Sequence, residues 1–289
     1  MLLAIDVGNT ETVIGLYALD GGDFDKEPVL DQAGVGIGHE DHPLRGLRYH
    51  WRLSSVPDRT PDEHAMLLTQ LLDLEGLDIS SAVSGIVICS SVPAMTTGLR
   101  QMAIRWFSKL PCVVVGPGVK SGMPILYDDP KEVGADRVAN AIGVFHLYGG
   151  PSVVVDMGTA TTFDAISAAG EYLGGAITPG VGISLEALFQ QAAALRPVEL
   201  VEPRNVIGRS TAESIQSGAL YGSAELVDGL CRRFKDELGS STTVVATGGL
   251  AELIAPYTEM VDHVEPWLTL EGLRVVYERN VSTGRASKR

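Results

Sequence analysis

The feature that most constrains this sequence is a nine-residue pattern that occurs twice. It reads AIDVGNTET over residues 4–12 and VVDMGTATT over residues 154–162. Asp6 aligns with Asp156, and Gly8 with Gly158, about half the chain apart. Each copy has an apolar β-rich run, a turn with Asp-x-Gly and a second β-rich run, which is the pattern of a β-hairpin. The repeat therefore predicts two related halves that each begin with a hairpin.

Later segments of the two halves also resemble each other. Residues 85–93 (GIVICSSVP) read as a buried strand followed by a helical stretch to Phe107, and residues 242–251 (TTVVATGGLA) have the same plan. Strands that alternate with helices are typical of an α/β fold. We therefore expect a duplicated α/β unit whose two halves face a cleft.

The helix and loop signals are local. A capping box at residues 60–63, with Pro61 at the first helical position, predicts a helix to Leu74. Residues 210–213 open another helix in the same way, and residues 129–146 read as a helix that follows a loop. Residues 21–48 are rich in Gly, Asp and His with little periodicity, and we interpret them as a surface loop or hairpin insertion.

Composition excludes several classes of protein. The formal net charge of −14 repels phosphate backbones, so we expect no nucleic-acid partner, although a site can still be locally positive. The three cysteines lie far apart and form no CxxC pair, which favours a reducing, cytoplasmic location over a disulfide framework or zinc site. The N-terminus does not read as a signal peptide, and no apolar stretch is long enough to predict a membrane span.

The two hairpin loops have the chemistry of phosphate binding. Glycine allows close approach, while backbone N–H groups and hydroxyls supply donors. Neither loop contains Lys or Arg, so bound cations must supply much of the neutralising charge. Asp6 and Asp156 are the natural holders of those cations, directly or through water. The alternative for each carboxylate is a turn-capping role.

Other nucleotide and metal motifs are incomplete. Residues 116–121 (GPGVKS) lack the spacing of a P-loop, and the glycines at 34, 36 and 38 do not form GxGxxG. The cluster of residues 39–42 (HEDH) could ligate a metal, but a solvated loop is the simpler interpretation.

A further element, residues 134–137 (GADR), lies where the predicted helix of residues 129–146 begins. Adjacent carboxylate and guanidinium groups point in different directions, so one can act as a base while the other orients an anionic substrate. A surface ion pair remains the alternative.

Together these elements resemble the type III pantothenate kinase family over nearly the whole chain. The matching segments are DVGNT (6–10), VGADR (133–137), DMGTATTFD (156–164), GGAITPG (174–180), GRSTAESIQSG (208–218), ATGGLA (246–251) and LTLEGL (268–273). The resemblance implies the actin-like ATPase (ASKHA) fold, with two ribonuclease-H-like domains and a central cleft. We expect one domain over residues 1–118, with the insertion at 21–48, and the other over 119–289, with a C-terminal helix at about 269–280.

The resemblance also implies a function and a set of roles. Family members use ATP to phosphorylate pantothenate to 4′-phosphopantothenate, the first step of coenzyme A biosynthesis, and are homodimers that need Mg²⁺ and K⁺ or NH₄⁺. It makes Asp136 the base, places Asp156 on the monovalent cation, and places Asp6 on Mg²⁺ through water. The implied ATP-binding residues are Asp6, Val7, Gly8, Asn9, Thr10, Glu11, Thr12 and Thr159. The implied pantothenate-binding residues are Tyr127, Gly134, Ala135, Asp136, Arg137 and Thr211.

Three alternatives stay open from the sequence. A regulatory relative that has lost activity is one, although the complete loops and GADR element argue against it. A kinase of another small molecule, such as a sugar, is the second. The third is an ATP-driven binding protein like Hsp70, for which the chain has no additional substrate-binding domain.

Overall fold

The structure, a computed structural model, describes residues 1–19, 29–30, 36–37 and 46–286. Contacts divide the chain into two compact units. Unit 1 comprises Met1–Gly122, Asp129–Leu147 and Thr269–Arg289, and unit 2 comprises Met123–Asp128 and Tyr148–Leu268. The expected division at residue 118 is a single cut, whereas the chain passes between the units more than once. The physical reason is that two helices beyond residue 118, in the segments Asp129–Leu147 and Thr269–Arg289, belong to unit 1.

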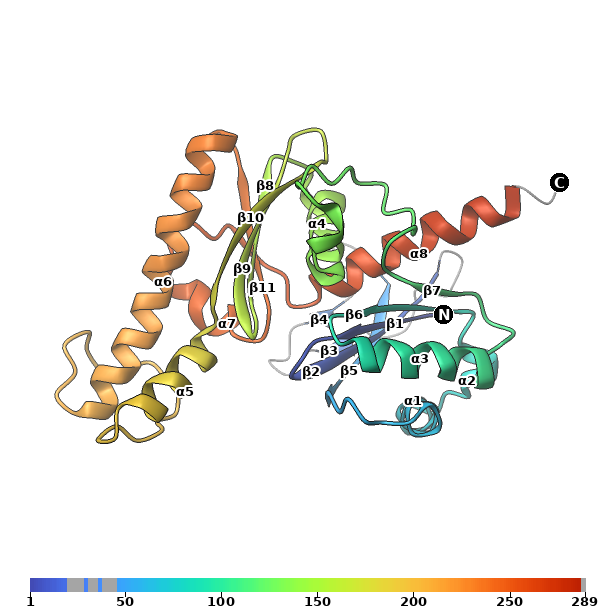
Figure 1. The fold of residues 1–289 in the computed structure, drawn as a ribbon, viewed down its shortest axis with the longest axis horizontal. Helices are drawn as coiled ribbons and strands as arrows, with labels where there is room; N and C mark the ends of the chain where they lie inside the picture. Colours follow the sequence, from blue (N-terminus) through green and yellow to red (C-terminus); the bar gives the residue numbers. More distant parts are fainter. Residues whose placement is uncertain (20–28, 31–35, 38–45, 287–289) are drawn as a thin grey trace. The chain divides into compact units, whose positions relative to one another are not determined.

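Unit 1 is built on a mixed five-stranded sheet. Its strands are β1 (Leu2–Val7), β2 (Glu11–Tyr17), β5 (Leu47–Ser54), β6 (Gly85–Ser90) and β7 (Cys112–Val114), in the order β5-β2-β1-β6-β7. The first three neighbours are antiparallel, and β6 and β7 continue the sheet in parallel. The carboxyl ends of β1 and β6 therefore meet at one edge of the sheet (Figure 1).

Unit 2 repeats this arrangement. Its strands are β8 (Ser152–Met157), β9 (Ala160–Ile166), β10 (Tyr172–Pro179), β11 (Thr243–Thr247) and β12 (His263–Val264), in the order β10-β9-β8-β11-β12. Strands β1 and β8 even share one pattern of burial, with a single half-buried position at the aspartate. The two predicted hairpins and the duplication of an α/β unit are confirmed.

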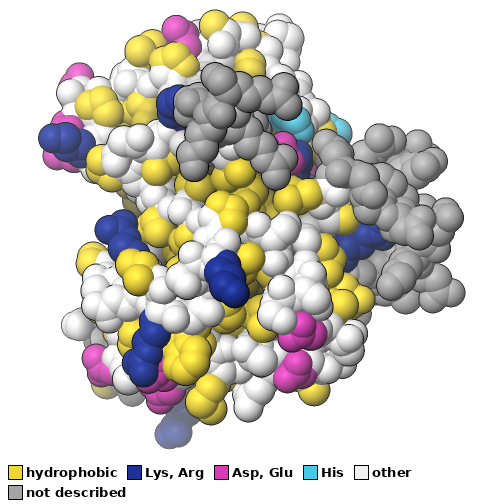
Figure 2. Space-filling view, turned by 90° about the vertical axis from the view of Figure 1, so that its right-hand side faces the viewer, with side chains coloured by type: hydrophobic (Ala, Val, Ile, Leu, Met, Phe, Trp, Pro, Cys, Tyr) yellow, Lys and Arg dark blue, Asp and Glu magenta, His cyan; other side chains and the backbone are white. Residues whose placement is uncertain are grey.

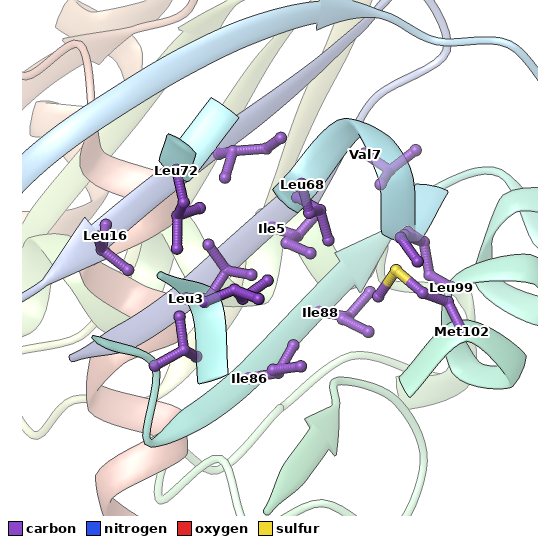
Figure 3. Close-up of a cluster of buried hydrophobic side chains, with 14 of the residues drawn as sticks. Leu3, Ile5, Val7, Leu16, Leu68, Leu72, Ile86, Ile88, Leu99 and Met102 are labelled. Carbon is purple, nitrogen blue, oxygen red and sulfur yellow. The ribbon is translucent and has the colours of Figure 1, made fainter. Parts of the chain in front are cut away.

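One face of the first sheet is covered by α1 (Pro61–Leu74), α2 (Ile79–Ala82) and α3 (Pro93–Trp106). The predicted capping box is present, since the Thr60 hydroxyl accepts from the Glu63 N–H and the Glu63 carboxylate accepts from the Thr60 N–H. Figure 3 shows the core between the helices and the sheet. Its labelled side chains are Leu3, Ile5, Val7, Leu16, Leu68, Leu72, Ile86, Ile88, Leu99 and Met102.

The opposite face of this sheet carries α4 (Ala135–Tyr148) and α8 (Leu268–Ala286). A Cβ added at Gly85 would lie 1.8 Å from the hydroxyl of Tyr277 in α8. A Cβ at Gly272 would lie 1.8 Å from the carbonyl oxygen of Ala139, so α4 and α8 pack with almost no space between their backbones. These glycines let the two helices approach the sheet and each other closely.

The fourth helix begins later than the sequence predicts. Residues 130–132 form a short 3₁₀ helix, whose N–H at Lys131 donates to the Asp129 carboxylate, and the α-helix starts only at Ala135. Gly134 separates the two elements. Helical propensity alone does not show this break, because Asp129 satisfies a local turn rather than the longer helix.

Unit 2 contains α5 (Val181–Gln191), α6 (Thr211–Leu238), α7 (Ala251–Ile254) and the 3₁₀ helix η2 (Ala255–Tyr257). As predicted, α6 has Ser210 as its N-cap, which accepts from the Glu213 N–H. The helix after β11 has only four residues, so the second half keeps the βα plan in a shortened form. The core of this unit lies between α6 and the sheet.

The predicted insertion at 21–48 is described only in part. The pairs Val29–Leu30 (β3) and Gly36–Ile37 (β4) form a small antiparallel ladder, and residues 47 and 48 already belong to β5. The remaining residues, including the HEDH cluster at 39–42, lie outside the described residues.

Within the described part of the chain, no helix has the length and apolar character to cross a bilayer. On the face drawn in Figure 2, Lys and Arg side chains are interspersed with those of Asp and Glu among apolar and uncharged ones.

One buried polar group in unit 1 links the fold to pH. His64 of α1 is 6% exposed, and its Nε2 has no hydrogen-bond partner within the described residues. A Cβ built at Gly98 of α3 would lie 3.5–3.6 Å from its ring atoms, so the imidazole packs against that glycine. Burial, with a smaller effect from Arg59, lowers the pKa of His64 to about 4.

We therefore predict that unit 1 loses stability as the pH falls. The folded pKa of His64 lies below its ordinary value, so the neutral ring stabilises the fold above about pH 6.5, and this contribution declines toward pH 4. Between pH 7 and 5 the loss should be on the order of 1 kcal/mol. Urea unfolding of the wild type and His64→Leu should show a smaller pH dependence in the variant. Identical pH dependence in both proteins would contradict this role.

Candidate functional site

The first hairpin loop is held by hydrogen bonds from neighbouring serines. The Ser55 hydroxyl donates to the Gly8 carbonyl at 2.7 Å and lies 2.9 Å from the Thr12 hydroxyl, and the Ser55 N–H donates to the Thr10 carbonyl at 3.0 Å. On the other side, the Ser91 N–H and hydroxyl both donate to the Val7 carbonyl. These contacts fix the backbone of the loop. The two serines have no marker in the sequence, because both are distant from the loop in the chain.

Some predicted phosphate-binding groups are already used to build the loop. The Gly8 N–H donates to the Glu11 carbonyl at 2.9 Å, and Thr12 is buried with its hydroxyl against Ser55. Val7 belongs to the core. The side chains of the loop that are exposed are those of Asn9, Thr10 and Glu11, and the Glu11 carboxylate accepts from Arg52 at 2.5 Å.

Asp6 lies at the carboxyl end of β1, half-buried, and its register partner in β6 is Cys89. Cys89 is fully buried. Its pKa is raised well above the ordinary thiol value, first by burial and then by the carboxylates of Asp6 and Asp136. Both carboxylates therefore lie close to one thiol within unit 1, although they are far apart in the sequence. The thiol is neutral there and donates a hydrogen bond to Asp6.

Asp136 lies in the first turn of α4, and its carboxylate contributes to the raised pKa of the Cys89 thiol. Its Oδ1 accepts from the Arg137 N–H at 2.9 Å. A Cβ at Gly134 would lie 2.4 Å from that same Oδ1. The glycine of the GADR element therefore leaves the space in which the carboxylate sits, and both Asp136 and Arg137 remain partly accessible.

The second hairpin loop repeats the position of the carboxylate with different neighbours. Asp156 is half-buried, and its register partner in β11 is Thr247. A Cβ at Gly248, where φ is +92°, would lie 2.5 Å from Asp156 Oδ1, and one at Gly158 would lie 3.3 Å from it. Two glycines thus border this carboxylate, where Gly248 also adopts a conformation that favours glycine. Thr159 is exposed at the turn.

The other predicted site residues of unit 2 lie on two elements. Tyr127, in the segment Met123–Asp128, has its ring centroid 6.4 Å from that of Tyr172. Thr211 is exposed as the first residue of α6 and lines a cavity of about 620 Å³ between α5 and α6. That cavity is mainly apolar, with Leu185, Leu188 and Leu226 among its lining residues.

The number of side chains that could act as metal ligands limits which cations could bind. Within the described residues, no cluster of three or more His, Cys, Asp or Glu side chains is placed to hold a metal ion. A magnesium ion that binds mainly through substrate phosphates and water needs only one or two protein carboxylates. The half-buried Asp6 at the strand end, next to an exposed polar loop, fits that requirement.

We predict that Gly134→Ala lowers turnover while the fold is kept. The added methyl group displaces the flexible Asp136 carboxylate, which can rotate, rather than any backbone atom. Asp136 is the expected base, and misplacing such a group by about 1 Å costs up to roughly 100-fold, so we expect a loss of at least about tenfold. Gly229→Ala in α6, where a Cβ meets nothing within 4 Å, serves as the control. Equal turnover in the Gly134→Ala and control proteins would contradict the placement of Asp136.

Comparisons with known proteins point to one family. A family model described as type III pantothenate kinase matches residues 2–233. The chain is 49% identical over 288 residues to the type III pantothenate kinase of Streptomyces griseus subsp. griseus, which covers 98% of this chain and 99% of that relative. It is also 49% identical over 280 residues to the type III pantothenate kinase of Moorella thermoacetica, covering 97% of this chain and 100% of that one.

A search of solved structures shows a likeness in fold. A Baf family protein from Campylobacter jejuni superposes with a TM-score of 0.55 at 17% identity, over 97% of this chain and 99% of that one. At this level of identity the likeness concerns the fold alone.

Proposed function

Since the chain belongs to the type III pantothenate kinase family, we propose that Asp136 is the base of its phosphoryl transfer from ATP to pantothenate. The observation that supports this assignment is the setting of the Asp136 carboxylate in the first turn of α4, where its Oδ1 accepts from the Arg137 N–H, Gly134 leaves the space that it occupies, and the group stays partly accessible. Asp136 would take the proton, and Asp6, near the end of β1, would hold a cation. The enzyme is an ATP-dependent kinase of coenzyme A biosynthesis, and its product is 4′-phosphopantothenate.

The proton transfer follows from the chemistry of the acceptor. The primary hydroxyl of pantothenate attacks the γ-phosphorus of ATP, the bond to the bridging oxygen of ADP breaks, and the hydroxyl proton passes to the carboxylate of Asp136. Mg²⁺ bound with ATP would supply charge neutralisation for the phosphates. Arg137, next in the chain, is suited to bind the carboxylate of pantothenate, because guanidinium and carboxylate groups pair well. Gly134 and Ala135 would line the same pocket.

For ATP we propose the loop of residues 6–12 in unit 1 and Thr159 in unit 2. The exposed Asn9 and Thr10 side chains are the direct donors of the first loop. Asp6 would bind Mg²⁺ through water. Thr12 would act mainly by supporting the loop, because its hydroxyl contacts Ser55.

For the monovalent cation we propose Asp156. The glycines at 158 and 248 leave the space around its carboxylate that larger side chains would fill. K⁺ and NH₄⁺ are bound by oxygen ligands, which a carboxylate and nearby backbone carbonyls provide. Neither loop carries a Lys or Arg that could take the place of such a cation.

We also propose a homodimer. Unit 2 exposes several large apolar side chains on and near α5 and α6, and the cavity between these helices is mainly apolar. The exposed side chains are Ile177, Ile183, Leu188, Val206, Ile207 and Leu226. The apolar side chains of α6 mostly contact the core of unit 2, since Leu220, Ala224 and Val227 are buried there. A second copy of unit 2 would therefore contact α5 and the residues around Val206 instead.

The location we propose is cytoplasmic. Cys89, Cys112 and Cys231 are all free thiols. Free thiols are the usual state in a reducing compartment, where coenzyme A precursors are also made.

The first prediction concerns the base. Asp136→Asn should fold normally and lose roughly 10²–10⁴-fold in turnover, because an amide cannot accept the hydroxyl proton. The measurement is pantothenate-dependent ADP release, with circular dichroism to check folding. Asp73→Asn, at an exposed position of α1, is the control. Near-normal turnover in Asp136→Asn would remove Asp136 from the mechanism.

The second prediction concerns the cations. Activity should require Mg²⁺ and should rise strongly with K⁺ or NH₄⁺ relative to Na⁺, since neither loop contains a Lys or Arg of its own. Asp156→Ala should lose the response to K⁺ together with most of its activity. The measurement is the ADP-release rate in matched chloride salts. Full wild-type activity in Na⁺ alone would contradict the monovalent-cation site.

The third prediction concerns Thr211 and assembly. Thr211→Val should weaken pantothenate binding more than ATP binding, by about 1 kcal/mol or somewhat more, because a hydroxyl beside a polar substrate is lost. Thr97→Val, at an exposed position of α3, is the control. Light scattering should show a dimer. A monomer with full activity would refute the proposed homodimer without affecting the assignment as a kinase.

A further inference from the structure

Asp164 of β9 is a carboxyl group in the interior of unit 2. It is 0% exposed, as is Tyr172 at the start of β10. The Tyr172 hydroxyl donates to Asp164 Oδ1 at 2.6 Å, and the Thr162 hydroxyl donates to Oδ2 at 3.3 Å. Burial of a carboxyl group is costly unless such bonds compensate it. None of the roles assigned so far explains why an acidic residue is buried here.

Tyr172 also anchors the segment Met123–Asp128, which carries Tyr127. The Tyr172 N–H donates to the Pro124 carbonyl at 2.9 Å, and the Leu126 N–H donates to the Tyr172 carbonyl at 2.8 Å. These two bonds add Ile125 to the sheet as a parallel bridge beside Tyr172. The backbone on both sides of this bridge is thereby fixed, directly before Tyr127.

The side chain of Tyr127 is positioned by the same residue. Its ring meets that of Tyr172 edge-on, at an interplanar angle of 61°. A Cβ built at Gly174, where φ is +129°, would lie 3.5 Å from the ring of Tyr127. The ring of Tyr127 therefore rests between Tyr172 and the backbone of Gly174. Tyr172 thus contacts both the buried carboxyl group and this ring.

We propose that Asp164 and Tyr172 form a positioning pair that fixes the ring of Tyr127 for pantothenate. Asp164 orients the Tyr172 side chain through the hydroxyl, and Tyr172 orients Tyr127 through its ring and its backbone. Neither residue of the pair touches the substrate. The inference rests on the pantothenate-binding role that the family resemblance implies for Tyr127, and it adds two residues that act through Tyr127.

Tyr172→Phe tests the pair, because it keeps the ring and removes only the hydroxyl. We expect the KM for pantothenate to rise about five- to twentyfold, with the KM for ATP changed less than twofold. Asp164→Asn, which keeps the shape of the side chain, should have the same selective effect and provides the test if Tyr172→Phe does not fold. Tyr148→Phe is the matched control, because the Tyr148 hydroxyl also donates to a buried carboxyl group, that of Glu265. Its KM for pantothenate should stay within twofold of the wild type.

The decisive measurement is a double-mutant cycle with Tyr127→Ala. If Tyr172 acts through Tyr127, then Tyr172→Phe should raise the KM for pantothenate in the wild-type background and leave it unchanged in the Tyr127→Ala background. Additive effects in the cycle would overturn the proposal. So would a Tyr172→Phe effect shared equally by ATP and pantothenate. No effect of Tyr127→Ala alone would overturn both this proposal and the role of Tyr127, whereas an effect of Tyr127→Ala without one of Tyr172→Phe would overturn the positioning pair only.

Discussion

The proposed roles depend on one constraint in each sheet. The central strand pairs in parallel with a neighbour, β1 with β6 in unit 1 and β8 with β11 in unit 2. In unit 1 this pairing places Asp6 beside Cys89, and in unit 2 it places Asp156 beside Thr247. Each aspartate is the single half-buried position of a strand that is otherwise buried. A carboxylate at such a strand end is stabilised by hydrogen bonds or by a cation, and it faces the loop that follows.

The two copies of the hairpin have diverged around a shared position. In unit 1, serines bind the carbonyl groups of the loop, and the carboxylates of both Asp6 and Asp136 contribute to the raised pKa of the Cys89 thiol. In unit 2, glycines border the carboxylate of Asp156 instead. These differences are consistent with the roles that we propose, namely proton transfer and Mg²⁺ binding in unit 1 and binding of a monovalent cation by Asp156 in unit 2. The duplication gives both hairpins the same backbone geometry, and the residues around each aspartate determine what that carboxylate can bind.

Sequence patterns predict the parts of this structure that depend on local periodicity. The two hairpins, the strand and helix after residue 85 and the capped helix from Pro61 are confirmed, because each depends on residues close in the chain. The later start of α4 and the discontinuous units depend on contacts between distant segments, such as Gly272 with Ala139. The support from Ser55 and the pair of Asp164 and Tyr172 have the same origin, so no local pattern could indicate them.

We propose that Asp6 binds Mg²⁺ and that Asp136 accepts the proton. These separate roles are tested most directly by the Mg²⁺ dependence of Asp6→Asn. Pantothenate-dependent ADP release should be measured over a series of Mg²⁺ concentrations at saturating ATP, beside the wild type. We expect the Asp6→Asn variant to need more Mg²⁺ for half-maximal activity, while its KM for pantothenate stays near the wild-type value. An unchanged Mg²⁺ requirement with a raised KM for pantothenate would contradict it.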